Sequence, residues 1–307
     1  MNGPRILFFG TPHYARIILL RLLQDPTWEV RVVTKPDVPQ GRRLQMTPSP
    51  VAQAAKEAGV QIDKPAVLKE FRQAWEDFAP DLIITAAYGK ILRPWLLELP
   101  RRGAFNLHAS ILPRWRGPNP IAWAIRAGDR VTGVTLMAMD EGVDTGPVVG
   151  MSEVTIGDNA TTGSLTQELA KAAGELLVQS LGQLMDNTAV RTPQPEAGIT
   201  YAPKFDPHDA RIDWTRPAIE IHRLVRSMTP DPGAYTVCCQ TRIKITECAY
   251  DEGEQMRGRA RLYGNAWKIG TGNGVLTVTK IRPAGRKDMT PGDFIRGQHI
   301  SGEVVCE

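Results

Sequence analysis

The chain has 307 residues, of which 42% are hydrophobic and 23% are charged, and its formal net charge is +4. This length favours two domains of roughly 100–200 residues each. The composition is typical of a globular protein, and no stretch approaches the ~20 continuous apolar residues of a membrane helix. These features argue against a membrane protein. Because the start also lacks the basic and apolar blocks of a signal peptide, we expect a cytoplasmic protein.

The first 186 residues alternate between patterns typical of strands and of helices. Strand patterns occur at residues 5–9, 29–34, 81–86, 104–107 and 131–139, and helical patterns at 15–23, 51–58, 120–127 and 165–184. The opening β-α-β order requires a crossover connection, which favours a parallel sheet. Residues 36–50 hold four prolines and predict a long loop. We therefore predict an open, mostly parallel α/β sheet over residues 1–186.

The remaining residues change in character. Residues 187–207 are rich in proline and lack periodicity, which predicts a linker. Over residues 208–307, a helix within 209–225 is followed by short β patterns at 234–239, 242–246, 258–263, 266–270 and 274–281. Five short strands separated by turns predict a small OB-like β-barrel, a fold that suits nucleic-acid binding.

Charge and cysteine content bear on the partners of this second domain. Residues 257–296 contain nine Lys or Arg and two Asp, an excess of seven positive charges that could attract phosphates or simply be solvated. The four cysteines, Cys238, Cys239, Cys248 and Cys306, form no paired CxxC pattern, and the histidines are scattered. We therefore predict no metal site and expect the cysteines to be free thiols.

Polar side chains gather where the predicted strands end. Asn106 and His108 lie two residues apart on a strand, so their side chains point the same way. An amide donor and an imidazole together suit a carbonyl oxygen that becomes negative during acyl transfer. Asp144 follows the next strand and could orient His108 or take a proton from an amine. Each residue alone could equally brace a loop or form a turn; only the combination predicts an acyl-transfer site.

Two other motifs do not support alternative activities. Asp144-Thr145-Gly146 matches the aspartic-protease triplet, but that chemistry needs two facing carboxylates and the chain has one such triplet. The first β-turn-α unit contains Gly10-Thr11-Pro12 rather than G-x-G-x-x-G, which argues against a dinucleotide cofactor.

The chain resembles the methionyl-tRNA formyltransferases in several motifs. Residues 106–117 (NLHASILPRWRG) resemble the signature of folate-dependent formyltransferases, and residues 140–146 (DEGVDTG) match a second motif. Related motifs occur in glycinamide ribonucleotide and sugar-nucleotide formyltransferases and in formyltetrahydrofolate dehydrogenase. Similarity to the tRNA enzymes extends over residues 9–12, the loop 35–50 with its Arg42, and residues 201–204, 210–214 and 283–289. Two departures are Pro118-Asn119-Pro120 after the signature and the lack of lysines after Arg42.

The resemblance implies a fold, substrates and site residues. It implies a Rossmann-like catalytic domain over residues 1–186 and a tRNA-binding barrel over 208–307. It also implies 10-formyltetrahydrofolate as formyl donor, no metal, and initiator methionyl-tRNA as partner. Asn106, His108 and Asp144 would be catalytic. The expected folate contacts are Tyr88, Gly89, Ile91, Leu92, Ser110, Ile111, Leu112, Pro113, Asp140 and Glu141. The expected tRNA contacts are Arg42, Arg43, Arg282, Arg286 and Lys287.

The reaction expected from this resemblance leaves some choices open. Asn106 and His108 would hold the formyl oxygen while the methionyl amine attacks, with Asp144 as the base. Either His108 or Asp144 could protonate the departing folate nitrogen. We expect a monomer. The alternatives are a formyltransferase acting on an amino sugar nucleotide and a non-catalytic RNA-binding protein with an OB-type barrel; an intact catalytic trio argues against the latter.

Overall fold

The computed structural model describes residues 3–41, 44–253, 256–300 and 302–307. The chain forms two compact units. The first comprises Met1–Pro120, Val131–Thr155 and Thr166–Pro203, and the second comprises Ile121–Arg130, Ile156–Leu165 and Lys204–Glu307. The segment expected to be a linker therefore packs with the first unit as far as Pro203. Two shorter segments from the first 186 residues, Ile121–Arg130 and Ile156–Leu165, belong to the second unit.

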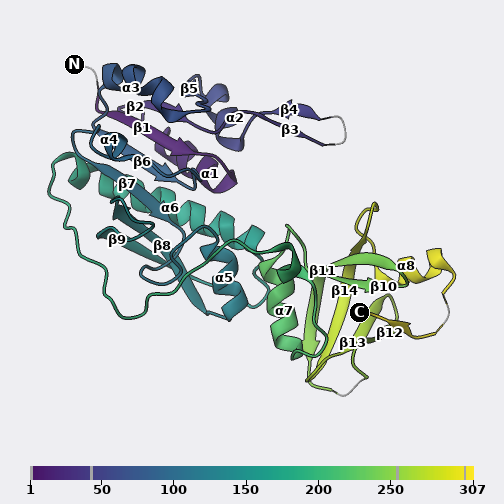
Figure 1. The fold of residues 1–307 in the computed structure, drawn as a ribbon. Coiled ribbons are helices and arrows are strands. Elements are labelled where there is room, and N and C mark those ends of the chain that lie inside the picture. Colours follow the sequence, from purple (N-terminus) through teal and green to yellow (C-terminus); the bar gives the residue numbers. More distant parts are fainter. Residues whose placement is uncertain (1–2, 42–43, 254–255, 301) are drawn as a thin grey trace. The chain divides into compact units, whose positions relative to one another are not determined.

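A seven-stranded sheet forms the centre of the first unit (Figure 1). Its order is β5-β2-β1-β6-β7-β8-β9. The strands are β1 (Arg5–Gly10), β2 (Glu29–Val33), β5 (Gln61–Asp63), β6 (Leu82–Ala86), β7 (Ala104–His108), β8 (Val131–Ala138) and β9 (Val148–Thr155). The first five are parallel, whereas β8 runs antiparallel to β7, and β9 to β8. The prediction of a Rossmann-like, mostly parallel sheet is confirmed.

The central strands are continuous apolar runs in the sequence because both faces of the sheet are buried. Neighbouring residues of β1, such as Leu7 and Phe8, point to opposite faces and are both fully buried. One face packs against Leu68, Trp75, Leu92 and Leu96. The helices up to residue 185 are α1 (His13–Leu22), α2 (Pro50–Glu57), η1 (Leu68–Phe71), α3 (Arg72–Phe78), α4 (Pro94–Leu97), α5 (Pro120–Ala127) and α6 (Thr162–Met185).

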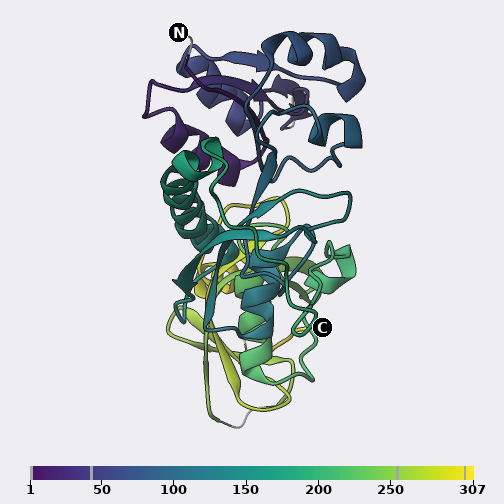
Figure 2. The same cartoon turned by 90° about the vertical axis from the view of Figure 1, so that its left-hand side faces the viewer.

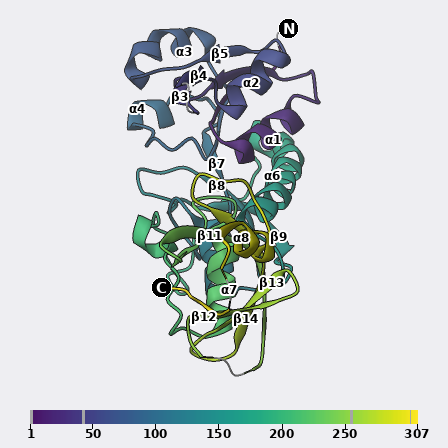
Figure 3. The same cartoon turned by 90° about the vertical axis from the view of Figure 1, so that its right-hand side faces the viewer.

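Helices α1 and α6 lie side by side (Figures 2 and 3). Gly174 makes their close approach possible, since a Cβ there would lie 3.0 Å from the Cβ of Arg21. Arg21 also forms a bidentate ion pair with Glu175, with Nε 2.6 Å from Oε1. After α6, residues 187–203 pack with the first unit, and Thr192 forms an antiparallel bridge with Val148 of the edge strand β9.

The region expected to be a long loop contains a small hairpin. Strands β3 (Val38–Gln40) and β4 (Gln45–Thr47) pair antiparallel. The side chains of Val38, Leu44 and Met46 are all largely exposed. The predicted tRNA contacts Arg42 and Arg43 lie outside the described residues.

The second unit is built on a six-stranded antiparallel sheet ordered β10-β11-β14-β13-β12-β15. Its elements are η2 (Pro207–Ala210), α7 (Ala218–Ser227), β10 (Tyr235–Cys238), β11 (Thr241–Asp251), β12 (Arg259–Tyr263), β13 (Ala266–Gly270), β14 (Val275–Pro283), α8 (Pro291–Gln298) and β15 (Val304–Val305). Figure 3 shows α7 against strands β11 and β14. Val237 and Glu307 exchange backbone hydrogen bonds of 3.1 and 2.9 Å, which bring the two edges together. The predicted small barrel is confirmed.

The expectation of four free cysteines is wrong for two of them. Cys238, at the end of β10, and Cys306, just after β15, are joined by a disulfide. The two residues face each other in an antiparallel bridge where the barrel closes, with their Cα atoms 4.6 Å apart. The pairing was not predictable because the two-residue strand β15 carries almost no pattern. Cys239 and Cys248 are free.

Within the part of the chain that the structure describes, no helix is both long enough and apolar enough to cross a bilayer.

Candidate active site

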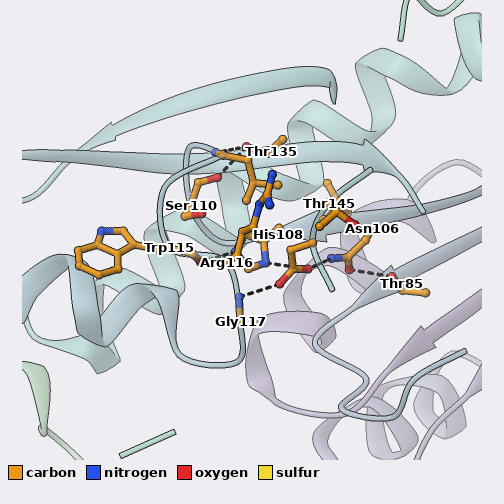
Figure 4. Close-up of polar contacts among 12 residues, drawn as sticks. Thr85, Asn106, His108, Ser110, Trp115, Arg116, Gly117, Thr135 and Thr145 are labelled. Carbon is orange, nitrogen blue, oxygen red and sulfur yellow. Dashed lines mark hydrogen bonds and ion pairs between the residues drawn. The ribbon is translucent and has the colours of Figure 1, made fainter. Parts of the chain in front are cut away.

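The three predicted catalytic residues come together beside β7, an internal strand of the first unit's sheet. Asn106 and His108 belong to β7, and their side chains project from the same face of that strand. Asp144 lies in the connection between β8 and β9, next to the antiparallel partner of β7. The side chains of His108 and Asp144 are only 6% and 13% exposed. The structure brings the three side chains together, and Figure 4 shows Asn106 and His108 close to each other with Gly117 beside them.

Asp144 is the point at which the other two residues converge. Its Oδ1 lies 3.4 Å from His108 Nδ1 and 3.5 Å from Asn106 Nδ2. Both distances exceed the 2.7–3.2 Å of ordinary N–H···O hydrogen bonds. A substrate oxygen between the two nitrogens could therefore form shorter bonds than the protein atoms form with one another.

The second carboxylate oxygen of Asp144 is held by the chain itself. The backbone N–H of Gly117 donates to Asp144 Oδ2 at 2.8 Å (Figure 4). Gly117 has φ +117, and a Cβ there would lie 2.9 Å from the carbonyl oxygen of Ala202, so this position requires glycine. Asp144 itself has φ +54. Few residues other than glycine adopt a left-handed conformation; aspartate enters it more readily than most, and surrounding contacts help to maintain it.

His108 is oriented by a backbone carbonyl. Its Nε2 lies 2.9 Å from the carbonyl oxygen of Trp115. Because a carbonyl can only accept a hydrogen bond, this contact requires the proton to be on Nε2. Neutral His108 can then take a further proton only at Nδ1, the nitrogen that faces Asp144. The tautomer thus places proton exchange between His108 and Asp144.

Asn106 is oriented from the neighbouring strand. Thr85 of β6 is in register with Asn106, and its Oγ1 donates to Asn106 Oδ1 at 2.7 Å. The same hydroxyl is 3.3 Å from the carbonyl oxygen of Phe105 and 3.4 Å from Met139 Sδ, both acceptors, so the short contact is favoured. With Oδ1 occupied, the amide must present Nδ2 to Asp144.

We expect Thr85→Val, which keeps the shape and removes the hydroxyl, to lower kcat by about 10–100-fold, because Asn106 would lose the bond that orients it. The KM for the formyl donor should change little. Thr85→Ser restores the hydroxyl and should recover most of the rate. Steady-state kinetics of both variants provide the check; a valine variant with the wild-type kcat would show that Asn106 is oriented without this bond.

The loop after β7 is braced by a second network. Ser110 Oγ donates to the carbonyl oxygen of Arg114 at 2.6 Å, and Thr135 Oγ1 donates to that of Ser110 at 2.7 Å. Thr135 Oγ1 also accepts from the N–H of Leu112 at 3.1 Å. These hydrogen bonds fix the backbone conformation of residues 110–114 beside Asn106, His108 and Asp144.

The predicted folate contacts fall into two groups. Tyr88 and Leu92 belong to the apolar core that packs on the sheet, and burial raises the pKa of Tyr88 to about 12. Ser110 and Leu112 are buried as well. By contrast, Ile91 is 74% exposed. The remaining predicted contacts, which are at least partly exposed, are Gly89, Ile111, Pro113, Asp140 and Glu141.

The predicted tRNA contacts that are described lie together on the second unit. Arg286 and Lys287 are exposed in the turn that follows β14. Arg282 forms a bidentate pair with Asp288, so part of its charge is neutralised. Arg259 and Arg261 both pair with Glu303, and Arg296 pairs with Asp293. The basic stretch therefore carries less uncompensated charge than its composition indicates.

Several residues that support the site were not predicted from the sequence. They are Thr85, the Gly117 amide, the Trp115 carbonyl and Gln194, whose side chain hydrogen-bonds to the Asp144 backbone and to Arg116. Among the described residues, no three His, Cys, Asp or Glu side chains are grouped so that they could hold a metal ion. An amide donor, an imidazole and a carboxylate around one position can bind a carbonyl oxygen and accept a proton. These are the requirements of an enzyme that transfers an acyl group to an amine.

Comparison with known proteins identifies the family. Residues 4–181 match the Formyl transferase model, and residues 204–299 match that of its C-terminal domain. The methionyl-tRNA formyltransferase of Magnetococcus marinus is 38% identical, covering 100% of both chains. That of Halorhodospira halophila is 39% identical over 98% of this chain and 99% of its own. The chain belongs to the formyl transferase family.

Solved structures share the fold. HypX from Aquifex aeolicus in complex with tetrahydrofolic acid has a TM-score of 0.67 and 19% identity, covering 96% of this chain and 47% of its own. WlaRD, a sugar 3N-formyl transferase, has a TM-score of 0.68 and 16% identity, covering 94% of this chain and 100% of its own. At these identities the likeness concerns the fold.

Proposed function

We propose that the protein transfers the formyl group of 10-formyltetrahydrofolate to the α-amino group of methionyl initiator tRNA, giving formylmethionyl-tRNA for translation initiation. The observation that carries the proposal is the convergence of Asn106 Nδ2 and His108 Nδ1 on Asp144 Oδ1. Relatives named methionyl-tRNA formyltransferase that match over the full length of the chain support this acceptor.

In this mechanism the formyl oxygen lies between Asn106 Nδ2 and a protonated His108 Nδ1. Both donors are aimed before the reaction starts, Asn106 by Thr85 and His108 by the carbonyl of Trp115. Negative charge grows on this oxygen as the amine nitrogen bonds to the formyl carbon. Donors that are already in place stabilise that charge without reorganisation.

Two proton transfers accompany the exchange of bonds. The attacking amine forms the new C–N bond and loses a proton to Asp144, whose carboxylate is held by the Gly117 amide. The bond between the formyl carbon and the folate nitrogen then breaks, and that nitrogen takes up a proton. The adjacent His108 and Asp144 can pass this proton between Nδ1 and Oδ1, so one pair serves as base and then as acid.

We propose the partly exposed residues around the trio as the folate contacts: Gly89, Ile91, Ile111, Pro113, Asp140 and Glu141. The buried Ser110 and Leu112, together with Tyr88 and Leu92 of the core, would support these contacts from within the fold. The trio and its supports are complete within one copy of the chain, and we propose a monomer. Since charged initiator tRNA is used where ribosomes initiate, we place the protein in the cytoplasm.

The proposed acceptor is tested by offering two amines with the same donor. One reaction contains methionyl initiator tRNA and the other an amino sugar nucleotide, and kcat/KM is measured for each. The proposal expects efficient formylation of the tRNA and none of the sugar. Formylation of the sugar alone would keep the formyl-transfer site and overturn the tRNA assignment. Donor turnover with either amine would exclude a non-catalytic RNA-binding protein.

The proposed tRNA surface includes Arg286 and Lys287, with Arg282 beside them and Arg42 and Arg43 from the segment outside the described residues. We expect the logarithm of tRNA affinity to fall linearly with the logarithm of salt concentration, by about 0.7–0.9 per phosphate contact. Lys287→Ala should reduce the slope by about that amount. Lys69→Ala, an exposed lysine of η1, is the matched control and should leave it unchanged. Equal slopes for wild type and Lys287→Ala would remove this residue from the surface.

A further inference from the structure

Gln194 joins two loops of the active site although the sequence places it in a presumed linker. Its Nε2 donates to the carbonyl oxygens of Asp144 and Gly146, at 2.9 and 2.8 Å. Its Oε1 accepts from Nε and Nη2 of Arg116, at 3.1 and 2.7 Å. Carbonyls can only accept and a guanidinium can only donate, so the side-chain amide has one possible orientation.

The two loops that Gln194 joins are those that hold the catalytic groups. One carries Asp144, whose backbone is in the left-handed region. The other runs through Arg116, between the Trp115 carbonyl that orients His108 and the Gly117 amide that binds the Asp144 carboxylate. The Gln194 side chain therefore links the backbone of Asp144 to the segment that holds the side chains of both Asp144 and His108.

The segment that contains Gln194 is held by hydrogen bonds on both sides of that residue. On one side, Thr192 and Val148 exchange backbone hydrogen bonds of 2.8 and 2.7 Å. On the other side, Thr200 accepts the N–H of Trp115 on its Oγ1 at 2.9 Å and that of Arg116 on its carbonyl at 2.9 Å. An anchored segment can transmit a fixed position to the loops it touches, whereas a free linker could not.

We propose that Gln194 is a positioning residue for the formyl-transfer reaction, which holds Asp144 in its left-handed conformation and in register with Gly117 and His108. The two loops fill all four hydrogen-bonding positions of the Gln194 side chain, so none is left for a substrate. Gln194 therefore acts through Asp144. This inference rests on the proposed function for its kinetic part. Its structural part, the clamp between the loops, stands independently of the reaction.

The kinetic test uses Gln194→Met, which keeps the length of the side chain and removes all four hydrogen bonds. We expect kcat to fall by about 10–100-fold, with little change in KM for the donor, because Asp144 is displaced by a fraction of an ångström. Gln179→Met, on an exposed position of α6, is the matched control and should retain the wild-type rate. Gln194→Glu keeps the partner of Arg116 but turns a carboxylate towards two carbonyls, and should lose at least as much.

A double-mutant cycle separates positioning from general support of the fold. If Gln194 acts through Asp144, adding Gln194→Met to Asp144→Asn should cause almost no further loss of rate. Losses that multiply in the double variant would overturn the proposal, since they would show that Gln194 acts on something other than Asp144. Melting temperatures of all variants show that each is folded under the assay conditions.

Amide hydrogen exchange provides a readout that does not depend on activity. In Gln194→Met the Gly117 amide should exchange faster than in wild type, while amides of β13 in the other unit should be unchanged. Faster exchange in a protein that formylates no amine would support the clamp and contradict the proposed function. Unchanged exchange together with an unchanged kcat would overturn the clamp.

Discussion

Asp144→Asn is expected to lower kcat by about 10²–10⁴-fold, the range of a general acid–base contribution, and to leave the fold intact. The asparagine amide has the size of the carboxylate and can still accept the Gly117 N–H on its oxygen. It cannot take a proton from an attacking amine, and it cannot form an ion pair with protonated His108 at the observed 3.4 Å. Single-turnover formyl transfer, measured with saturating donor, provides the rate.

Asp186→Asn is the control for this substitution, because Asp186 is an exposed aspartate beyond the end of α6. It should retain the wild-type rate. Donor affinity, measured separately by equilibrium binding, should change little in Asp144→Asn, since the carboxylate acts on the reacting groups. A rate within a few-fold of wild type for Asp144→Asn would mean that the amine loses its proton elsewhere.

Asn106→Ala is expected to lower kcat by about 10²–10³-fold, the cost of removing one donor to a developing oxyanion. The alanine leaves Thr85 Oγ1 without its nearest acceptor, but the carbonyl of Phe105 lies 3.3 Å away and can replace it. The fold should therefore tolerate the change. The loss should be found in kcat rather than in KM for the donor, because the oxyanion exists only during the reaction.

The variant Asn106→Asp is a second test of the role of Asn106 as a hydrogen-bond donor. This variant loses the Nδ2 donor and places a second carboxylate about where Nδ2 now lies 3.5 Å from Asp144. It should be at least as impaired as Asn106→Ala, since negative charge beside the formyl oxygen opposes the charge that develops there. Activity near wild type in Asn106→Ala would remove Asn106 from the catalytic group.

The sequence was informative where periodicity and local geometry determine the structure. The alternation of side chains along a strand was enough to place Asn106 and His108 on one face of β7. The rule for parallel strands was not enough to place Asp144, because β8 runs antiparallel to β7 and its last residue, Ala138, lies opposite Phe105 near the start of β7. Both parts of the fold, a mostly parallel sheet and a small barrel, could be predicted from the order of apolar runs and turns.

Features that depend on contacts between distant segments could not be predicted. Gln194 lies 50 residues from Asp144 and 78 from Arg116, in a proline-rich stretch without periodicity. In the sequence, Thr85 is indistinguishable from the other residues of a buried strand. Its role in orienting Asn106 follows only from the register of β6 with β7. Tyr88 carries a polar group, yet its ring packs against Phe9 in the core. A non-local signal, such as covariation between residues 116, 144 and 194, would be needed to find the clamp.

The measurement that tests the central claim most directly is formylation of methionyl initiator tRNA with 10-formyltetrahydrofolate, followed by acid gel for the wild type and for His108→Ala. The account predicts that the wild type produces formylmethionyl-tRNA and that the product vanishes, or forms at least about a hundred times more slowly, in His108→Ala. Formylation at the wild-type rate in His108→Ala would contradict the assignment of this site.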